Sequence, residues 1–203
     1  MNNTDNISHE PGDSRETAAM REFLAPASHD GALALGEIGL PENALVLDVG
    51  TGVGISAIFL ALQGHQVLTG EPANDDSVYA KKDWETNAAQ FGVSDKIKFR
   101  AFDASQMPFE NESFDAVFFF GALHHIDEPG RASATSEGLR VCSKSGHLVI
   151  FEPNQETIKR VREHYPGHPV SANPLEYIDD KSLVINTLKG ELMDVFILST
   201  KKA

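Results

Sequence analysis

The chain has a single cysteine, Cys142, among its 203 residues. One thiol cannot form an internal disulfide, and it excludes any metal site built from several cysteines. Cys142 lies in an apolar stretch, where a thiol usually packs as a small hydrophobic group. We therefore expect a core residue in a protein of a reducing compartment, and a cytoplasmic location.

Positive charge is also scarce. The chain carries 17 Lys and Arg against 30 Asp and Glu, which gives a formal net charge of −13. Proteins that bind nucleic acid draw much of their affinity from Lys and Arg contacts to phosphates. The charge balance therefore argues against a nucleic-acid partner.

Long hydrophobic runs are absent. The longest, residues 116–123, is interrupted by Gly121 and is far shorter than the roughly 20 residues of a membrane span. Residues 1–16 are polar and lack the basic start and apolar stretch of a signal peptide, so we expect a disordered tail there. A hydrophobic content of 41% predicts that residues 17–203 form one globular domain without a membrane span.

Residues 45–54 (LVLDVGTGVG) join an apolar segment to three alternate glycines. The apolar part is typical of a strand buried in a parallel sheet, and residues 55–62 have the apolar density of a buried helix. Glycines between a strand and a helix allow a sharp turn and close approach of a ligand to the backbone N–H groups of the helix. The segment predicts a nucleotide-binding loop.

The glycine spacing separates two families of ligand. A dinucleotide fold has the pattern G-x-G-x-x-G and would need a glycine where this chain has Ile55. The pattern D-x-G-x-G-x-G instead resembles motif I of class I S-adenosylmethionine (SAM) dependent methyltransferases, in particular the type 11, small-molecule branch that includes enzymes of quinone biosynthesis. The resemblance implies that the methionine end of SAM is held by Asp48, Gly50, Thr51, Gly52 and Gly54.

Strands and helices alternate along the rest of the chain. We expect strands at residues 66–69, 97–102, 114–120 and 147–151, helices at 75–90 and 129–142, and a terminal hairpin of strands 183–188 and 192–199. Such alternation predicts an α/β fold with helices on both faces of the sheet. The resemblance implies a single-domain Rossmann-like methyltransferase fold, in which a mostly parallel seven-stranded sheet receives an antiparallel C-terminal strand beside the fifth.

Ligands of such sheets collect at the carboxyl ends of the strands, so acidic residues after each strand are candidates for binding. Glu71 follows the second strand at the distance where a carboxylate can accept hydrogen bonds from ribose hydroxyls, with Asp75 as the alternative. Asp103 follows the third strand, and the resemblance implies that it accepts from the adenine amino group. Phe102 and Ala104 would then contact the ring.

The segment from Gly121 to His124 and His125 follows the fourth strand and would border the methyl group and its acceptor. The resemblance is to small-molecule methyltransferases with a Leu-His-His segment here. The Asn/Asp-Pro-Pro-aromatic motif of nucleic-acid amino-methyltransferases is absent. His124 and His125 are candidate catalytic residues, as a general base or as loop structure. We expect no metal, because no acidic residue or cysteine lies at ligand spacing nearby, and Pro166 and Gly167 separate His164 from His168.

The sequence thus predicts a SAM-dependent methyltransferase that transfers a methyl group in line from the sulfonium to a small-molecule acceptor, with S-adenosylhomocysteine as product. Contacts to the acceptor are expected from a helix at residues 17–24, a loop at 27–31 and the connection 154–180, or from a pocket completed in a homo-oligomer. Two alternatives remain: a non-catalytic SAM-binding or interaction protein of the same fold, and a dinucleotide-dependent reductase.

Overall fold

The computed structural model describes residues 15–75 and 83–200. The expected disordered tail lies outside these residues except for its last two, which belong to the first helix, α1 (Arg15–Ile38). Part of the helix expected at 75–90 also lies outside them. Within the described ranges, no helix combines the length and the apolar character needed to cross a membrane.

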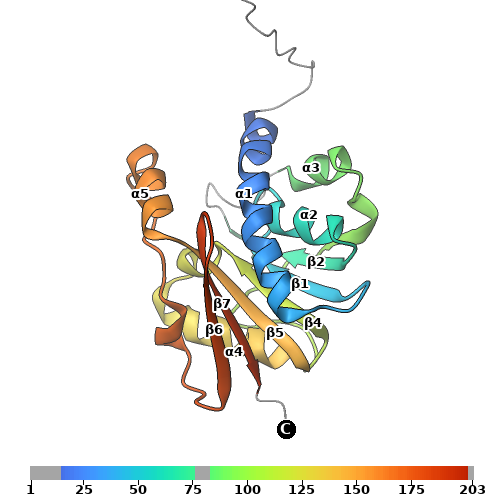
Figure 1. Cartoon of the computed structure of the whole chain (residues 1–203), viewed down its shortest axis with the longest axis vertical. Helices are drawn as coiled ribbons and strands as arrows, with labels where there is room; N and C mark the ends of the chain where they lie inside the picture. Colours follow the sequence, from blue (N-terminus) through green and yellow to red (C-terminus); the bar gives the residue numbers. More distant parts are fainter. Residues whose placement is uncertain (1–14, 76–82, 201–203) are drawn as a thin grey trace, which may run out of the picture.

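A seven-stranded sheet forms the centre of the molecule, with the strand order β3-β2-β1-β4-β5-β7-β6 (Figure 1). The strands are β1 (Leu45–Val49), β2 (Gln66–Gly70), β3 (Ile97–Phe99), β4 (Phe114–Phe120), β5 (Cys142–Pro153), β6 (Leu183–Lys189) and β7 (Met193–Thr200). The first five strands are parallel, whereas β7 pairs antiparallel with both β5 and β6. This arrangement confirms the expected fold class, including the antiparallel strand beside the fifth.

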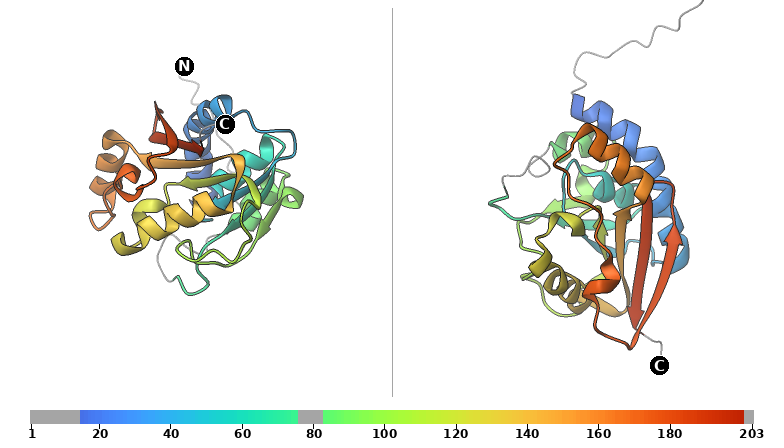
Figure 2. Two further views of the ribbon diagram at one scale, coloured as in Figure 1. Left: turned by 90° about the horizontal axis from the view of Figure 1, so that it is seen from below. Right: turned by 90° about the vertical axis from the view of Figure 1, so that its left-hand side faces the viewer.

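Helices cover both faces of the sheet. In addition to α1, these are α2 (Ile55–Leu62), α3 (Trp84–Gln90), α4 (Glu128–Val141) and α5 (Gln155–His164), with 3-10 turns η1 (Ser94–Lys96), η2 (Leu123–His125) and η3 (Pro174–Tyr177). One hydrophobic core packs α1, α2 and α3 against the sheet, and the second packs α4 against the opposite face (Figure 2).

Strand β4 shows why the sheet lies between two cores. Its sequence FDAVFFF alternates Phe118 toward the core of α1 and α2 with Phe119 toward the core of α4. Phe118 stacks on Phe151 of β5 with ring centroids 5.7 Å apart, and all three rings are almost completely buried. Full burial of a side chain of this size contributes roughly 1.5–3 kcal/mol. The central strands therefore provide a rigid base for the loops at their ends.

Several element boundaries differ from the sequence expectation. Helix α3 begins at Trp84, where the carboxylate of Asp83 accepts a hydrogen bond from the N–H of Thr86 (3.4 Å), and Asp75 lies outside this helix. Strand β3 ends at Phe99, so Phe102 and Asp103 lie in a turn, whereas β5 begins at Cys142 and ends at Pro153. Cys142 is buried as expected, and burial raises the pKa of its thiol to about 12.

The prediction of a loop at residues 27–31 is wrong, because α1 continues through this segment. Pro26, Asp30 and Gly31 disfavour a helix locally, but tertiary contacts stabilise it. Gly31 packs so closely on the ring of Phe59 that a Cβ atom would overlap the ring.

Asp30 belongs to α1, and its fully buried carboxylate packs against the turn between β6 and β7. It accepts hydrogen bonds from the backbone N–H groups of Glu191 (2.6 Å), Leu192 (2.9 Å) and Met193 (2.9 Å). A Cβ atom at Gly190 would overlap this carboxylate. The acid therefore ties α1 to the β6–β7 hairpin and has a structural part in the fold.

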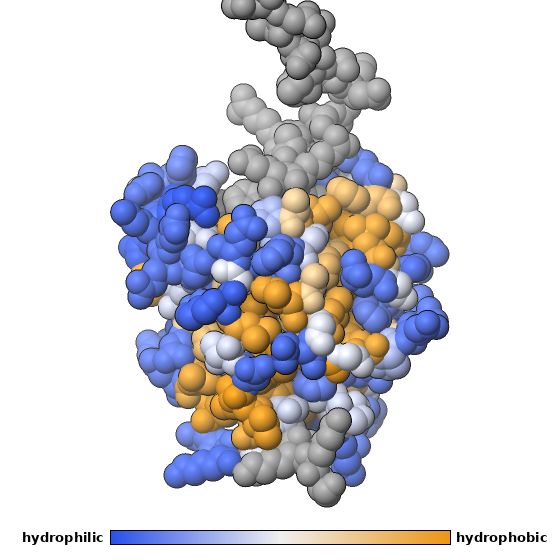
Figure 3. Space-filling model, in the orientation of Figure 1, coloured by the Kyte–Doolittle hydropathy of each residue, from blue (hydrophilic) through white to orange (hydrophobic). Residues whose placement is uncertain are grey.

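The outer strand of this hairpin is exposed. Val184 and Ile185 of β6 and Leu33 of α1 are among the large apolar residues with substantial exposure. Figure 3 shows apolar surface over this part of the molecule, in the orientation of Figure 1. The sheet thus ends in an apolar edge strand on the side opposite to β3.

Candidate functional site

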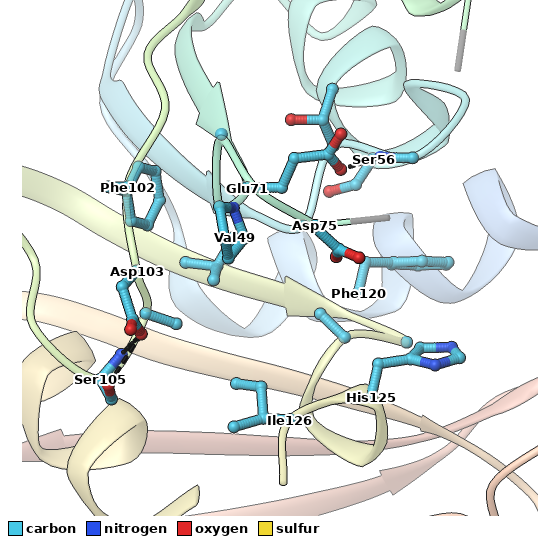
Figure 4. Close-up of a pocket in the computed structure, with 18 of the residues that line it drawn as sticks. Val49, Ser56, Glu71, Asp75, Phe102, Asp103, Ser105, Phe120, His125 and Ile126 are labelled. Carbon is cyan, nitrogen blue, oxygen red and sulfur yellow. Dashed lines mark hydrogen bonds between the residues drawn. The ribbon is translucent and has the colours of Figure 1, made fainter. Parts of the chain in front are cut away.

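A cavity of about 640 Å³ opens where β1, β2 and β4 end, beside the loops that follow these strands. Its lining residues are Val49, Gly50, Thr51, Gly52, Val53, Ile55, Ser56, Gly70, Glu71, Pro72, Asp75, Phe102, Asp103, Ala104, Ser105, Phe120, Gly121, Ala122, His125, Ile126, Asp127 and Gly130. Figure 4 shows that Glu71, Asp103 and His125 reach this cavity from three different segments of the chain. The position matches the strand-end rule from which these residues were predicted.

The glycine loop forms one wall of the cavity. Gly50, Gly52 and Gly54 have φ angles of 93°, 49° and 89°, in the left-handed region that favours glycine. A Cβ atom at Gly50 would lie 2.9 Å from the Cβ of Ala122, so the loop after β1 and the segment after β4 approach each other closely there. Glycine at this position therefore allows the two segments to meet at the wall of the cavity.

Glu71 lies directly after β2 and is 9% exposed. Its Oε2 accepts a hydrogen bond from the N–H of Gly52 (3.1 Å), which fixes the carboxylate beside the glycine loop. A carboxylate at this depth accepts hydrogen bonds in a partly desolvated environment, where they are stronger than in water. Asp75, the alternative from the sequence, also lines the cavity.

Asp103 lies in the turn after β3 and also lines the cavity. Its Oδ1 accepts hydrogen bonds from both the N–H and the hydroxyl of Ser105 (2.7 Å each), which orient the carboxylate. Phe102 beside it is 6% exposed and packs edge-on against Phe109, with ring centroids 5.2 Å apart. The turn therefore presents an oriented acceptor next to a buried apolar ring.

Asp48 and Gly54 belong to the predicted loop but are not among the residues that line the cavity. Asp48 is fully buried in β1, where its Oδ2 accepts a hydrogen bond from the hydroxyl of Thr69 (2.8 Å). Within the described part of the chain its Oδ1 has no hydrogen-bond partner. Burial raises the pKa of Asp48 from 3.8 to about 7. The acid lies beneath the glycine loop rather than on its surface.

This raised pKa predicts a pH dependence of stability. Between about pH 4 and pH 7 the folded protein holds a proton on Asp48 that the unfolded chain has released, so the free energy of unfolding falls as pH rises through this window. The neutral isostere in Asp48→Asn removes this contribution. We expect the melting temperature of the wild type to fall by several degrees relative to that of Asp48→Asn between pH 5 and pH 8, measured calorimetrically without ligand. Parallel curves for the two proteins would contradict the prediction.

The histidine segment forms the 3-10 turn η2 after β4. His125 lines the cavity, whereas His124 is 3% exposed and lies behind it. The ring of His124 donates from Nδ1 to Oε2 of Glu152 (2.9 Å), and its backbone N–H donates to Oε1 of the same carboxylate (3.3 Å). Partial burial of the imidazole of His125, with the nearby His124 and His168, lowers its pKa to about 3, so the ring is neutral near pH 7.

Further contacts hold η2 in place from the side of α4. The guanidinium of Arg131 donates from Nε to the carbonyl of Ile126 (2.9 Å) and from Nη2 to the carbonyl of His124 (3.2 Å). It also donates to the hydroxyl of Tyr177 in η3 (3.0 Å). The turn that carries both histidines is therefore held by Arg131 of α4 and by Glu152 of β5.

The structure brings most of the predicted site residues to one cavity. Beside His124, outside the cavity lining, lie two residues that the sequence analysis did not assign to the site. The predicted residues on the cavity lining are Gly50, Thr51, Gly52, Glu71, Phe102, Asp103, Ala104, Gly121 and His125. Glu152 was missed although it follows the apolar run of β5, where the strand-end rule could have found it. His168 was considered only in a pair with His164, because nothing local to the sequence places it beside η2.

A model of the methyltransferase domain family matches residues 47–150, which is just over half of the chain. The chain belongs to this family, within the class I SAM-dependent methyltransferases. The matched range runs from within β1 to within β5, so it includes the ends of β1, β2 and β4, which border the cavity. SAM is the cofactor that this family and fold imply.

Among curated relatives, the demethylmenaquinone methyltransferase of Clavibacter sepedonicus is 29% identical over 120 residues, which cover 59% of this chain and 45% of that protein. The sterol 24-C-methyltransferase of Pneumocystis carinii is 34% identical over 128 residues, which cover 63% of this chain and 32% of that protein. The chain spans less than half the length of these relatives. A Methanococcus maripaludis protein, provisionally assigned as a SAM-dependent methyltransferase, has the same fold, with a TM-score of 0.67, 16% identity and 99% coverage of both chains.

Proposed function

We propose that this protein binds SAM in the cavity at the strand ends and transfers its methyl group to a small-molecule acceptor. The observation that carries the proposal is the convergence of the glycine loop, Glu71 and Asp103 on one cavity. A cavity of about 640 Å³ is within the range of roughly 300–1,000 Å³ typical of small-molecule sites. Family membership supports the same activity.

The residues around the cavity suit the parts of SAM. We propose that the backbone of the loop from Gly50 to Gly54 holds the methionine end, with Asp48 beneath it. Glu71 would accept hydrogen bonds from the ribose hydroxyls, since it is anchored beside the loop by Gly52. Asp103 would accept from the adenine amino group while Phe102 contacts the ring.

When bound, SAM supplies an activated methyl group, so the protein has only to orient the acceptor and exclude water. Phe120, Gly121 and Ile126 line the cavity together with His125. These apolar residues favour an acceptor with an apolar body, and the quinone and sterol named for the curated relatives are molecules of this kind.

The two histidines of η2 have different places in this proposal. His125 borders the acceptor position, because it lines the cavity. His124 is a positioning residue, because Glu152 holds its ring and backbone away from the cavity. The low pKa of His125 makes it a weak proton acceptor and favours a role in orienting the acceptor. The single buried thiol of Cys142 supports the expected cytoplasmic location.

Calorimetry with SAM, S-adenosylhomocysteine and NAD tests the cofactor. We expect saturable binding of the first two and none of NAD, because the loop lacks the third glycine of a dinucleotide site. Transfer of a labelled methyl group from SAM to demethylmenaquinone, a sterol or a metabolite extract tests catalysis. Binding of NAD in place of SAM would overturn the proposal. SAM binding without transfer to any acceptor would favour the non-catalytic alternative.

A further inference from the structure

Three imidazoles meet beside the cavity. His124 and His125 come from η2, and His168 comes from the connection between α5 and η3. Ring centroids are 4.2 Å apart for His124 and His125, 5.3 Å for His124 and His168, and 5.0 Å for His125 and His168. One ring nitrogen from each residue lies within 4.8 Å of the others. The three rings therefore form a triangle that offers one nitrogen from each corner.

Hydrogen bonds set the tautomer of two of these rings. The Nδ1 of His124 faces the carboxylate of Glu152 at 2.9 Å, and the Nδ1 of His168 faces the carbonyl of Pro169 at 2.9 Å. Both partners are acceptors, so each Nδ1 carries the proton and each neutral ring has its lone pair on Nε2. Histidines that bind metal commonly donate their other ring N–H to a carboxylate or a backbone carbonyl, which fixes the ring and strengthens it as a ligand. His124 has such a carboxylate partner in Glu152, and His168 has such a carbonyl partner in Pro169.

Glu152 also connects the two segments that supply the histidines. Its Oε2 accepts a hydrogen bond from the backbone N–H of Ala172 (2.8 Å), four residues after His168. The same carboxylate receives two hydrogen bonds from His124, and its side chain is 2% exposed. Together with the contacts of Arg131 to the carbonyls of His124 and Ile126, this network fixes the positions of His124 and of the connection that carries His168. The arrangement is thus held by residues outside the triangle.

We propose that His124, His125 and His168 form a binding site for a divalent transition-metal ion such as Zn²⁺, in which Glu152 and the carbonyl of Pro169 orient the rings of His124 and His168. Imidazole suits Zn²⁺, and a site with three histidines leaves one coordination position for water or another ligand. Ligand nitrogens around tetrahedral Zn²⁺ are about 3.4 Å apart. The nitrogens of the three histidines lie within 4.8 Å of one another, so modest rotations of the imidazole rings would bring these nitrogens to the separation that Zn²⁺ requires. The site adjoins the cavity, since His125 belongs to both. The proposal does not depend on methyl transfer.

Metal binding is measured on the full-length protein, purified without a polyhistidine tag and stripped with a chelator. Co²⁺ is the spectroscopic probe, because a four-coordinate site gives intense visible absorption, and Zn²⁺ competition reports the affinity. We expect one equivalent to bind with the absorption of a four-coordinate site. Octahedral spectra, or no saturable binding, would overturn the proposal without reference to any variant.

The variants separate this triangle from other histidines. We expect His168→Ala to weaken Zn²⁺ binding by more than 100-fold and Glu152→Gln to weaken it roughly 10–100-fold. The matched control is His164→Ala, which removes an exposed histidine at the end of α5 whose ring contacts the carbonyl of Arg160. Circular dichroism and SAM affinity report the fold of each variant. Equal binding by the wild type and a folded His168→Ala protein, or an equal loss in His164→Ala, would place the metal elsewhere and overturn the assignment.

Discussion

Replacement of Glu71 by alanine is expected to weaken SAM binding by at least about 100-fold. Glu71 is an anchored and largely buried carboxylate in the cavity, held beside the glycine loop by the N–H of Gly52. Hydrogen bonds to a charged partner contribute roughly 1.5–3 kcal/mol each. Loss of two such bonds to the ribose therefore accounts for a change of this size. Calorimetric titration of Glu71→Ala with SAM measures it.

Two further variants show whether the loss of SAM affinity in Glu71→Ala comes from the missing hydrogen bonds to the cofactor. Glu71→Gln keeps one acceptor oxygen and should show an intermediate affinity. Glu42→Ala removes an exposed carboxylate in the turn before β1, at the opposite end of the strands from the cavity, and should bind SAM as the wild type does. The assignment of Glu71 fails if Glu71→Ala folds normally and binds SAM with unchanged affinity.

Replacement of Asp30 by alanine should lower the free energy of unfolding by roughly 3–5 kcal/mol. The change leaves three backbone N–H groups of the β6–β7 turn without their acceptor, and each buried donor without a partner costs about 1–3 kcal/mol. A fully buried cavity of the size of the lost carboxylate adds to the cost. Denaturant unfolding at equilibrium measures the difference.

Glu37→Ala provides a matched comparison on the same helix. Glu37 also joins α1 to the hairpin, through a hydrogen bond of 3.3 Å from the side-chain amide of Asn186, but it is exposed to solvent. Its loss should cost less than about 1 kcal/mol. Similar losses for the two variants would show that burial does not govern the strength of the Asp30 contacts.

The sequence contained enough local information to predict most strands of the sheet and the glycine loop that forms one wall of the site. The apolar run of β4 and the glycines after β1 are local signals, and the family resemblance supplied the antiparallel place of β7. The strand-end rule predicted Glu71, Asp103 and His125, because a parallel sheet brings its strand ends to one edge. These predictions needed no knowledge of contacts between distant residues.

The features that the sequence did not show depend on long-range contacts. His168 joins η2 only because the connection after α5 folds back along β5, where Ala172 meets Glu152. Residues 27–31 follow Pro26 and include Asp30 and Gly31, which disfavour a helix locally, yet contacts to the sheet and the hairpin stabilise a helix there. Local propensity is a weak guide where tertiary contacts contribute more free energy than it does.

The contact between Asp30 and the β6–β7 turn also constrains how the protein is made. Asp30 precedes its partner Glu191 by 161 residues, so the ribosome synthesises the carboxylate long before the N–H groups that donate to it. Until then α1 cannot complete its docking without burying a carboxylate that lacks those donors, which is costly. We expect nascent chains that end before the hairpin to leave α1 undocked and sensitive to protease, and to become protected only when residues 183–200 emerge.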